Sequence, residues 1–241
     1  MTTRSIELVV FDLDGTLLDS VPDLASAANQ TLDRLGYPML PQNLIRDFVG
    51  NGADVLLARA LSGGIDIDPA LSAELRQQAR ILFDAFYADT QHRQSQLYPT
   101  VKTTLRKLQT AGISMALLTN KPSQFIPAIL AQHDIAECFI DIIGGDTFSH
   151  RKPDPMALHW LMAKHQLSPE QVLMVGDSKH DIQAAKGACC YAFGLTYGYN
   201  HGEPIQASRP DFVGDQLSDL LDILSLDDEV FTDQLAALAN Q

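Results

Sequence analysis

Short apolar runs alternate with stretches of helical periodicity along most of this chain. Strand-like runs occupy residues 6–11, 113–118, 139–143, 172–175 and 191–196, with a weaker one at 211–213. Apolar residues recur at helical spacing at 101–110, 123–132, 155–165, 179–186 and 216–224. Strands that are apolar on both faces and separated by helices predict a parallel sheet that is covered on each side. The predicted fold class is therefore α/β, with a doubly wound parallel sheet.

One stretch, from residue 20 to about residue 92, does not alternate in this way. Its periodicity predicts helices at 21–35, 42–49, 53–61 and 71–90, with no convincing strand among them. A helical block after the first strand indicates an insertion that packs as a small bundle beside the sheet. We predict a core of residues 1–19 and 94–225, an inserted all-helical cap of residues 20–93, and a tail of residues 226–241 that can form a short helix.

Composition narrows the classes of partner and the cellular compartment. The chain has 241 residues, of which 46% are hydrophobic, and a net charge of −13 that argues against nucleic acid or an anionic membrane surface as partner. Three cysteines, two of them adjacent, favour free thiols in a reducing compartment. The first apolar run stops at Asp12, which is too early for a signal peptide or a membrane span. We expect a cytoplasmic monomer or homodimer.

The first predicted strand ends in two carboxylates, Asp12 and Asp14. On an extended backbone, side chains two residues apart point the same way. Like charges this close raise the free energy unless a cation or a shared proton relieves them. Gly15 then allows a turn, and Thr16 adds a hydroxyl group. For this motif alone, a plain polar turn is the alternative.

Polar residues follow other predicted strands too, and the carboxyl ends of parallel strands share one edge of the sheet. Thr119 and Asn120 follow the second strand, Lys152 comes shortly after the third, and Asp177 and Asp181 follow the fourth. Each has a plain alternative, such as a helix cap or a solvated lysine. Their convergence on one edge favours an active site.

Phosphoryl transfer to a carboxylate is the chemistry that needs this set of residues. An aspartate nucleophile is ionised at neutral pH, but it attacks a phosphate dianion only when the negative charge is screened. Mg2+ suits this task because it is held by a few carboxylates together with the substrate phosphate. Lysine and hydroxyl donors then bind the remaining phosphoryl oxygens, and a second carboxyl group moves the proton.

Four motifs, DLDGT (12–16), LLTN (117–120), RKPDP (151–155) and GDSKHD (176–181), resemble those of the haloacid dehalogenase superfamily of phosphohydrolases. The helical block after the first motif resembles the members with a helical cap. The resemblance implies a Rossmann-like core, with Asp12 as the nucleophile that forms an aspartyl-phosphate and Asp14 as the general acid/base. It also implies that Thr119 and Lys152 bind the phosphate and orient the nucleophile, with Asn120 as an additional contact.

The same resemblance implies a magnesium site. Asp12 and Asp177 would bind Mg2+ through their carboxylates and Asp14 through its backbone carbonyl, while Asp181 would act from behind these ligands or through a metal-bound water. Dehalogenase members usually lack the second acid of the first motif, so Asp14 favours a phosphatase.

Two further stretches, residues 48–54 and 195–203, resemble bacterial phosphoglycolate phosphatases, which implies hydrolysis of 2-phosphoglycolate. Gly50, Asn51 and Gly52 precede the predicted helix at 53–61, so their backbone N–H groups can bind the substrate carboxylate. A simple interhelical turn is an equal alternative for this loop. For the whole chain, the alternatives are a phosphosugar mutase like β-phosphoglucomutase, a phosphatase for another small ester or pyrophosphate, and a non-catalytic regulatory protein on the same scaffold.

Overall fold

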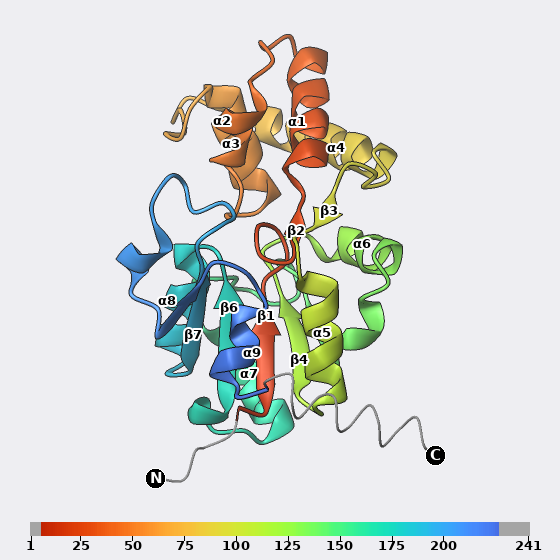
Figure 1. Ribbon diagram of the computed structural model, residues 1–241. Helices are drawn as coiled ribbons and strands as arrows, with labels where there is room; N and C mark the ends of the chain where they lie inside the picture. Colours follow the sequence, from red (N-terminus) through yellow and green to blue (C-terminus); the bar gives the residue numbers. More distant parts are fainter. Residues whose placement is uncertain (1–5, 227–241) are drawn as a thin grey trace.

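The computed structural model describes residues 6–226, which form a sheet-based core with a layer of helices above it (Figure 1). The core sheet has the strand order β5-β4-β1-β6-β7-β8, and all of its pairs are parallel. Its strands are β1 (Leu8–Phe11), β4 (Ser114–Leu118), β5 (Asp141–Ile143), β6 (Val172–Gly176), β7 (Tyr191–Leu195) and β8 (Phe212–Gly214). The predicted α/β class and the parallel, doubly wound sheet are confirmed.

Helices cover both faces of this sheet. In the central strand β1, Val9 and Phe11 join one buried cluster, while Leu8 and Val10 join a second cluster on the opposite face. The first face is covered by α5 (Val101–Thr110), α6 (Ile126–Gln132) and α9 (Asp219–Ile223), and the second by α7 (Met156–His165) and α8 (Lys179–Gly187). Burial on both faces explains why the strand sequences are continuously apolar rather than alternating.

The inserted helices form a separate layer above the carboxyl edge of the sheet (Figure 1). They are α1 (Val21–Arg34), α2 (Gln42–Arg46), α3 (Ala53–Ser62) and α4 (Ala73–Asp89). A two-stranded antiparallel ribbon of β2 (Leu18–Asp19) and β3 (Gln96–Leu97) joins this layer to the core. All of these helices lie inside the range predicted for the cap, and we keep that name for them. The exact division of the chain into domains stays a prediction.

A buried carboxylate fixes the two connections between cap and core. Asp23, in the first turn of α1, accepts hydrogen bonds at Oδ2 from the backbone N–H groups of Gln94 and Ser95, at 3.1 and 2.7 Å. The Ser95 hydroxyl donates a third, at 2.6 Å. The entry into the cap and the exit from it are therefore tied together at one point.

Smaller features depart from the sequence-based expectation. The strands β2 and β3 were not predicted, and the helix expected at 123–132 begins as a 3-10 turn. The described 3-10 segments are Ser123–Phe125, Ala136–Cys138, Pro169–Gln171 and Ile205–Ser208. The predicted tail helix falls almost entirely on residues 227–241, outside the described residues.

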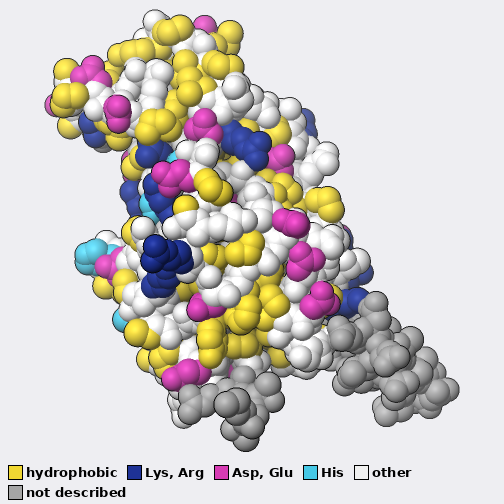
Figure 2. Space-filling model, turned by 60° about the vertical axis from the view of Figure 1, so that its left-hand side comes forward, with side chains coloured by type: hydrophobic (Ala, Val, Ile, Leu, Met, Phe, Trp, Pro, Cys, Tyr) yellow, Lys and Arg dark blue, Asp and Glu magenta, His cyan; other side chains and the backbone are white. Residues whose placement is uncertain are grey.

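The cysteines, the helices and the charged side chains of the surface bear on the expectations from composition. Cys138, Cys189 and Cys190 are free thiols, as expected. In residues 6–226, no helix has the length and apolarity that crossing a membrane requires. On the face drawn in Figure 2, several Lys and Arg side chains lie near the level where cap and core meet, although the chain as a whole is acidic.

Candidate active site

Three of the predicted site residues follow neighbouring strands of the sheet. Asp12 comes directly after β1, Thr119 after β4 and Asp177 after β6. Because β1 pairs with both β4 and β6, these strand ends lie side by side at one edge. Lys152 reaches the same edge from the loop between β5 and α7. The structure thus brings together residues that are up to 165 positions apart in the sequence.

Lys152 is a buried cation shared by two of the acids. Its Nζ atom lies 2.9 Å from Asp12 Oδ1 and 2.6 Å from Asp181 Oδ1, and it donates a hydrogen bond of 2.6 Å to the backbone carbonyl of Leu118. Burial by itself lowers the pKa of Lys152, but the charges of Asp12 and Asp181 outweigh burial and raise the pKa above its ordinary value. The side chain therefore stays charged and holds the Asp12 carboxylate in a fixed position.

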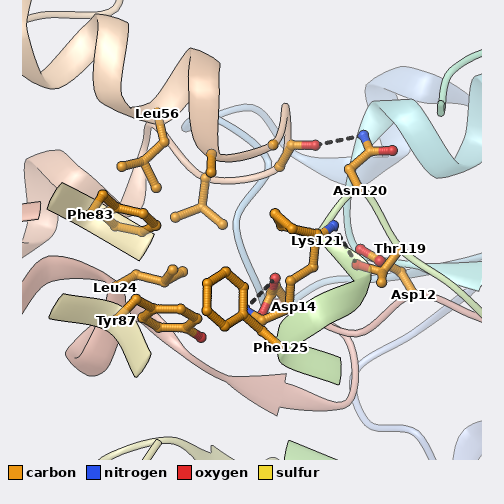
Figure 3. A pocket seen from close by; sticks show the side chains of 15 residues that line it. Asp12, Asp14, Leu24, Leu56, Phe83, Tyr87, Thr119, Asn120, Lys121 and Phe125 are labelled. Atoms are coloured by element: carbon orange, nitrogen blue, oxygen red, sulfur yellow. Dashed lines mark hydrogen bonds and ion pairs between the residues drawn. The ribbon is translucent and has the colours of Figure 1, made fainter. Parts of the chain in front are cut away.

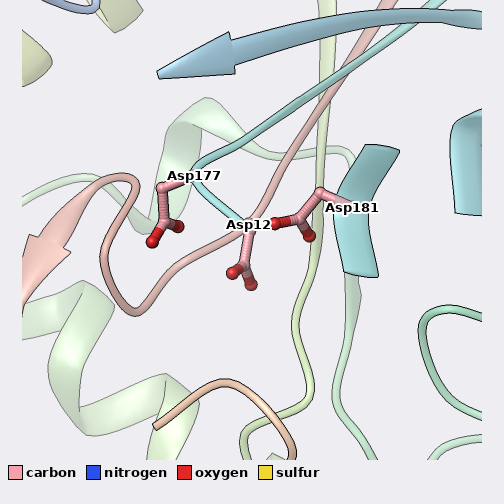
Figure 4. Close-up of side chains that lie close together, drawn as sticks. All are labelled: Asp12, Asp177 and Asp181. Atoms are coloured by element: carbon pink, nitrogen blue, oxygen red, sulfur yellow. The ribbon is translucent and has the colours of Figure 1, made fainter. Parts of the chain in front are cut away.

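Asp12, Asp177 and Asp181 form a cluster of buried carboxylates (Figure 4). Each offers one oxygen atom, and these atoms lie within 4.8 Å of one another. Burial raises the pKa of Asp12 to about 6, and burial together with the two neighbouring acids raises the pKa of Asp177 well above its ordinary value. One lysine cannot neutralise three carboxylates, so the cluster has an excess of negative charge.

This cluster fits a divalent cation. Asp12 Oδ1 is buried, and the contact that the structure gives it is the ion pair with Lys152 Nζ at 2.9 Å. A buried oxygen of this kind can accept a further cation contact. The donors are all carboxylate oxygens, the ligand type that Mg2+ and other hard cations prefer.

Asp177 is held rigidly from both sides. Its Oδ1 accepts a hydrogen bond of 2.7 Å from the Thr16 hydroxyl, and its Oδ2 accepts one of 2.6 Å from the backbone N–H of Tyr199. Gly15 and Gly198, with φ of +92° and +99°, pack so closely that a Cβ atom at either position would lie 2.3 Å from Asp177 Oδ2. Both glycines are therefore needed for close approach to this carboxylate as well as for their backbone conformation.

Asp181 lies at the start of α8 and has partners at both oxygens. Oδ1 pairs with Lys152, while Oδ2 accepts hydrogen bonds from the backbone N–H and the hydroxyl of Ser178, at 3.1 and 2.7 Å. Asp181 therefore orients Lys152 beside the acid cluster, and its position behind the metal ligands stays a prediction.

The Asp14 carboxylate is separate from the acid cluster and pairs with a different lysine. Lys121 Nζ donates to Asp14 Oδ1 and Oδ2 at 3.0 and 3.1 Å. A metal contact through the backbone carbonyl of Asp14 stays a prediction. Lys121 was not among the predicted site residues. Its sequence position could have identified Lys121, because this residue directly follows Asn120 at the carboxyl end of β4.

A small cavity of about 40 Å3 lies between these residues and the cap (Figure 3). Its polar side is formed by Asp12, Asp14, Thr119, Asn120 and Lys121. Its apolar side chains are Leu24, Val49, Ala53, Leu56, Phe83 and Tyr87 from the cap, with Pro122 and Phe125 from the core. Figure 3 shows Leu56, Phe83 and Tyr87 on the side opposite Asp12 and Thr119. Such walls exclude water and strengthen electrostatic interactions inside.

The glycine-rich loop of the cap contributes backbone to this cavity. Gly50 and Gly52 line the cavity, and Asn120 Nδ2 donates hydrogen bonds to the backbone carbonyls of Gly50 and Lys152, at 2.9 and 3.0 Å. Asn120 thereby joins the cap loop to the core loop that carries Lys152. Its predicted contact with substrate stays a prediction.

The Asn51 side chain has different partners. Its Oδ1 accepts a hydrogen bond of 3.0 Å from Arg59, and its Nδ2 lies 2.7 Å from Nε2 of His180 on α8. It is not one of the residues that line the cavity. Asn51 therefore links cap and core in this structure, and its assignment to substrate binding stays a prediction.

Comparison with known proteins agrees with this geometry. A family model described as haloacid dehalogenase-like hydrolase matches residues 9–194. A phosphoglycolate phosphatase of Vibrio cholerae is 64% identical over 92% of this chain and 98% of its own length. Phosphoglycolate phosphatase 1 of Pseudomonas aeruginosa is 46% identical over 91% of this chain and 80% of its own.

A solved structure has the same fold. The crystal structure of a predicted phosphoglycolate phosphatase from Haemophilus somnus is 38% identical in sequence and superposes with a TM-score of 0.86. The match covers 92% of this chain and 99% of the other. The match to the family model takes in the DLDGT motif and the acidic motif after β6 as well as the whole cap. The chain belongs to the haloacid dehalogenase-like hydrolase family.

Proposed function

We propose that this protein is a Mg2+-dependent phosphomonoester hydrolase whose substrate is 2-phosphoglycolate. The observation that carries the proposal is the position of Asp12, which pairs with Lys152 and borders both the acid cluster and the cavity beneath the cap. The Asp12 carboxylate therefore lies beside both the cation site and an apolar compartment for the leaving group. The names of the relatives from Vibrio cholerae and Pseudomonas aeruginosa support the choice of substrate.

The proposed reaction has two steps. Asp12 attacks phosphorus, the bond between phosphorus and the ester oxygen breaks, and Asp14 gives a proton to the departing glycolate oxygen. Asp14 then removes a proton from water, and the resulting nucleophile cleaves the aspartyl-phosphate to free Asp12 and phosphate. Thr119 and Lys152 bind the phosphoryl oxygens during both steps.

Asp12, Asp177 and the backbone carbonyl of Asp14 are the groups that would hold Mg2+, with Asp181 and Lys152 behind them. When bound, the ion supplies positive charge that screens the phosphate dianion from the Asp12 carboxylate. This local charge also resolves the conflict between an anionic substrate and a chain with a net charge of −13.

The size of the cavity supports a small leaving group. A cavity needs about 10–15 Å3 to hold one water molecule, so a cavity of about 40 Å3 has room for about three groups of that size. Glycolate is of this scale, whereas a hexose is several times larger. The geometry therefore supports a phosphatase for a short ester over a phosphosugar mutase. We further infer a cytoplasmic location, which the three free thiols support, and a monomer or homodimer.

The test is phosphate release from 2-phosphoglycolate by the full-length protein, with Mg2+ and after its removal with EDTA. We expect release to require Mg2+ and to fall by about 10⁴-fold or more in Asp12→Asn, because the nucleophile is lost. Asp134→Asn is the matched control, since Asp134 is exposed and pairs with Lys102 at the surface. Equal rates in wild type and Asp12→Asn would overturn the proposal.

A further inference from the structure

Lys121 is a buried cation that the proposed reaction leaves without a task. Its side chain is only 2% exposed, and its Nζ atom contacts both oxygens of Asp14. The ammonium group also lies over the ring of Tyr87, 4.7 Å from the ring centre. Among the described residues that line the cavity, Lys121 is the only Lys or Arg. Burial of an ammonium group costs free energy, so the position of this cation in an apolar pocket needs a functional explanation.

We infer that Lys121 binds the carboxylate of the leaving group and thereby makes the enzyme select short phosphorylated acids over neutral esters of the same size. The inference rests on the proposed function, because it takes the glycolate part of the substrate to occupy this cavity. In this proposal the main positive charge for the substrate carboxylate comes from the Lys121 side chain and not from the backbone N–H groups of the glycine-rich loop.

The covalent structure of the substrate determines where such a cation must lie. In 2-phosphoglycolate, one CH2 group separates the ester oxygen from the carboxylate. Asp14 must contact the ester oxygen to give it a proton, so the carboxylate comes to lie within a few ångströms of Asp14. Lys121 Nζ is 3.0–3.1 Å from the Asp14 oxygens, so it lies close to the place that the substrate carboxylate would occupy.

The other walls of the cavity do not offer a charge for this group. The nearest cap side chains are Leu24, Leu56, Phe83 and Tyr87, which contribute no positive charge. Lys152 pairs with Asp12 and Asp181 and does not line the cavity. The two cap arginines nearest the glycine-rich loop, Arg46 and Arg59, do not line the cavity either. Lys121 is thus the cation that a carboxylate can reach.

The experiment compares kcat/KM for 2-phosphoglycolate with kcat/KM for 2-hydroxyethyl phosphate, which has a similar size but no carboxylate. We expect wild type to prefer 2-phosphoglycolate and Lys121→Met to lose that preference by about 10- to 100-fold, as for a hydrogen bond to a charged group. Loss of the contact with Asp14 lowers activity on both esters, so the ratio of the two kcat/KM values is the readout. Lys102→Met is the control, because Lys102 pairs with Asp134 at the surface.

The outcomes separate the possible explanations. Equal losses on both esters would mean that Lys121 only positions Asp14, and this would overturn the inference. Unchanged preference in the variant would overturn it as well, while leaving the proposed function in place. A wild type without preference for 2-phosphoglycolate would contradict the proposed function itself. Lys121→Gln, which is one atom shorter and uncharged but keeps a hydrogen-bond donor, repeats the test if the methionine variant does not fold.

Discussion

Thr16 donates a hydrogen bond of 2.7 Å from its hydroxyl group to the buried carboxylate of Asp177, 161 residues further along the chain. The first and last motifs of the site are therefore in direct contact. The bond holds Asp177 Oδ1 in one direction, while Tyr199 N–H fixes Oδ2. Groups that orient a metal ligand in this way commonly affect metal affinity as strongly as some ligands do.

Thr16→Val should therefore raise the Mg2+ concentration needed for half-maximal phosphate release by about 10-fold or more. The shape of the side chain is kept, so the effect comes from the lost hydroxyl. Thr31→Val is the matched control, because Thr31 is also buried but donates to the Ala27 carbonyl within α1. The idea fails if both variants show the Mg2+ dependence of wild type.

Gly198 and Gly202 allow a second test in the loop after β7. Both have positive φ, of +99° and +77°, so alanine strains the backbone at either position. Only at Gly198 would the new Cβ also meet Asp177 Oδ2, at 2.3 Å, whereas nothing lies within 4 Å at Gly202. We expect Gly198→Ala to lower kcat and Mg2+ affinity, and Gly202→Ala to lower stability by about 1–2 kcal/mol with little change in kcat. Thermal unfolding and a Mg2+ titration of activity measure the two effects, and equal losses of activity would contradict this explanation.

The central part of the fold was predictable from the sequence because the sheet is buried on both faces. Val10 pairs with Ala116 on one side and Met174 on the other, so each strand shows as an apolar run. The polar residues that follow the strands could be assigned to one edge, because parallel strands end on the same side. Asp12, Thr119 and Asp177 meet there as expected.

Other features were not predictable, for identifiable physical reasons. The strands β2 and β3 have two residues each, which is too short to show any periodicity. The burial of Lys121 depends on Asp14 and on Tyr87, which lie 107 and 34 positions away, so a lysine after a strand was indistinguishable from a solvated one. The side-chain partner of Asn51, His180, is 129 positions away. Substrate binding by the backbone N–H groups of this loop stays a prediction. Contacts between cap and core are visible only in the folded chain.

A pH-dependent contribution to stability is expected at the edge of the sheet. Asp141, at the start of β5, pairs with Lys164 and with His165, whose Nε2 lies 2.6 Å from Asp141 Oδ2. Burial raises the pKa of Asp141, but these two partners outweigh burial and lower the pKa below its ordinary value. A lowered pKa in the folded state means that the carboxylate stabilises the protein at neutral pH. This contribution is lost as the pH falls below the ordinary value of about 4 and through the folded-state pKa.

Urea unfolding of wild type and Asp141→Asn from pH 7 to pH 3 measures this contribution. Wild type should be the more stable at pH 7, and the difference should shrink as the pH falls below about 4. Asp134→Asn is the control, because Asp134 is 79% exposed and its pair with Lys102 is screened by solvent. A difference between wild type and Asp141→Asn that stays constant over this range would contradict the expected linkage.

Leu56 and Leu57 provide a test of whether the cap limits the size of the substrate. Both are leucines of α3 and almost fully buried, but only Leu56 lines the cavity above Asp12 and Asp14, whereas Leu57 borders a groove on another side of the helix. Truncation of either to alanine should destabilise the protein by about 2–5 kcal/mol, because both leave a hole in a packed core. The loss of stability is therefore matched between the two variants.

Only Leu56→Ala should change which substrates are accepted. The cavity of about 40 Å3 leaves little space for an added methyl group, so wild type should discriminate against 2-phospholactate, which has one more methyl than 2-phosphoglycolate. The space released at Leu56 should raise kcat/KM for 2-phospholactate relative to 2-phosphoglycolate by about 10-fold, since one methylene is worth roughly 1–3 kcal/mol in such pockets. Leu57→Ala should keep the wild-type ratio. If both variants change the ratio equally, the effect comes from a loosened cap, and Leu56 does not set the size limit.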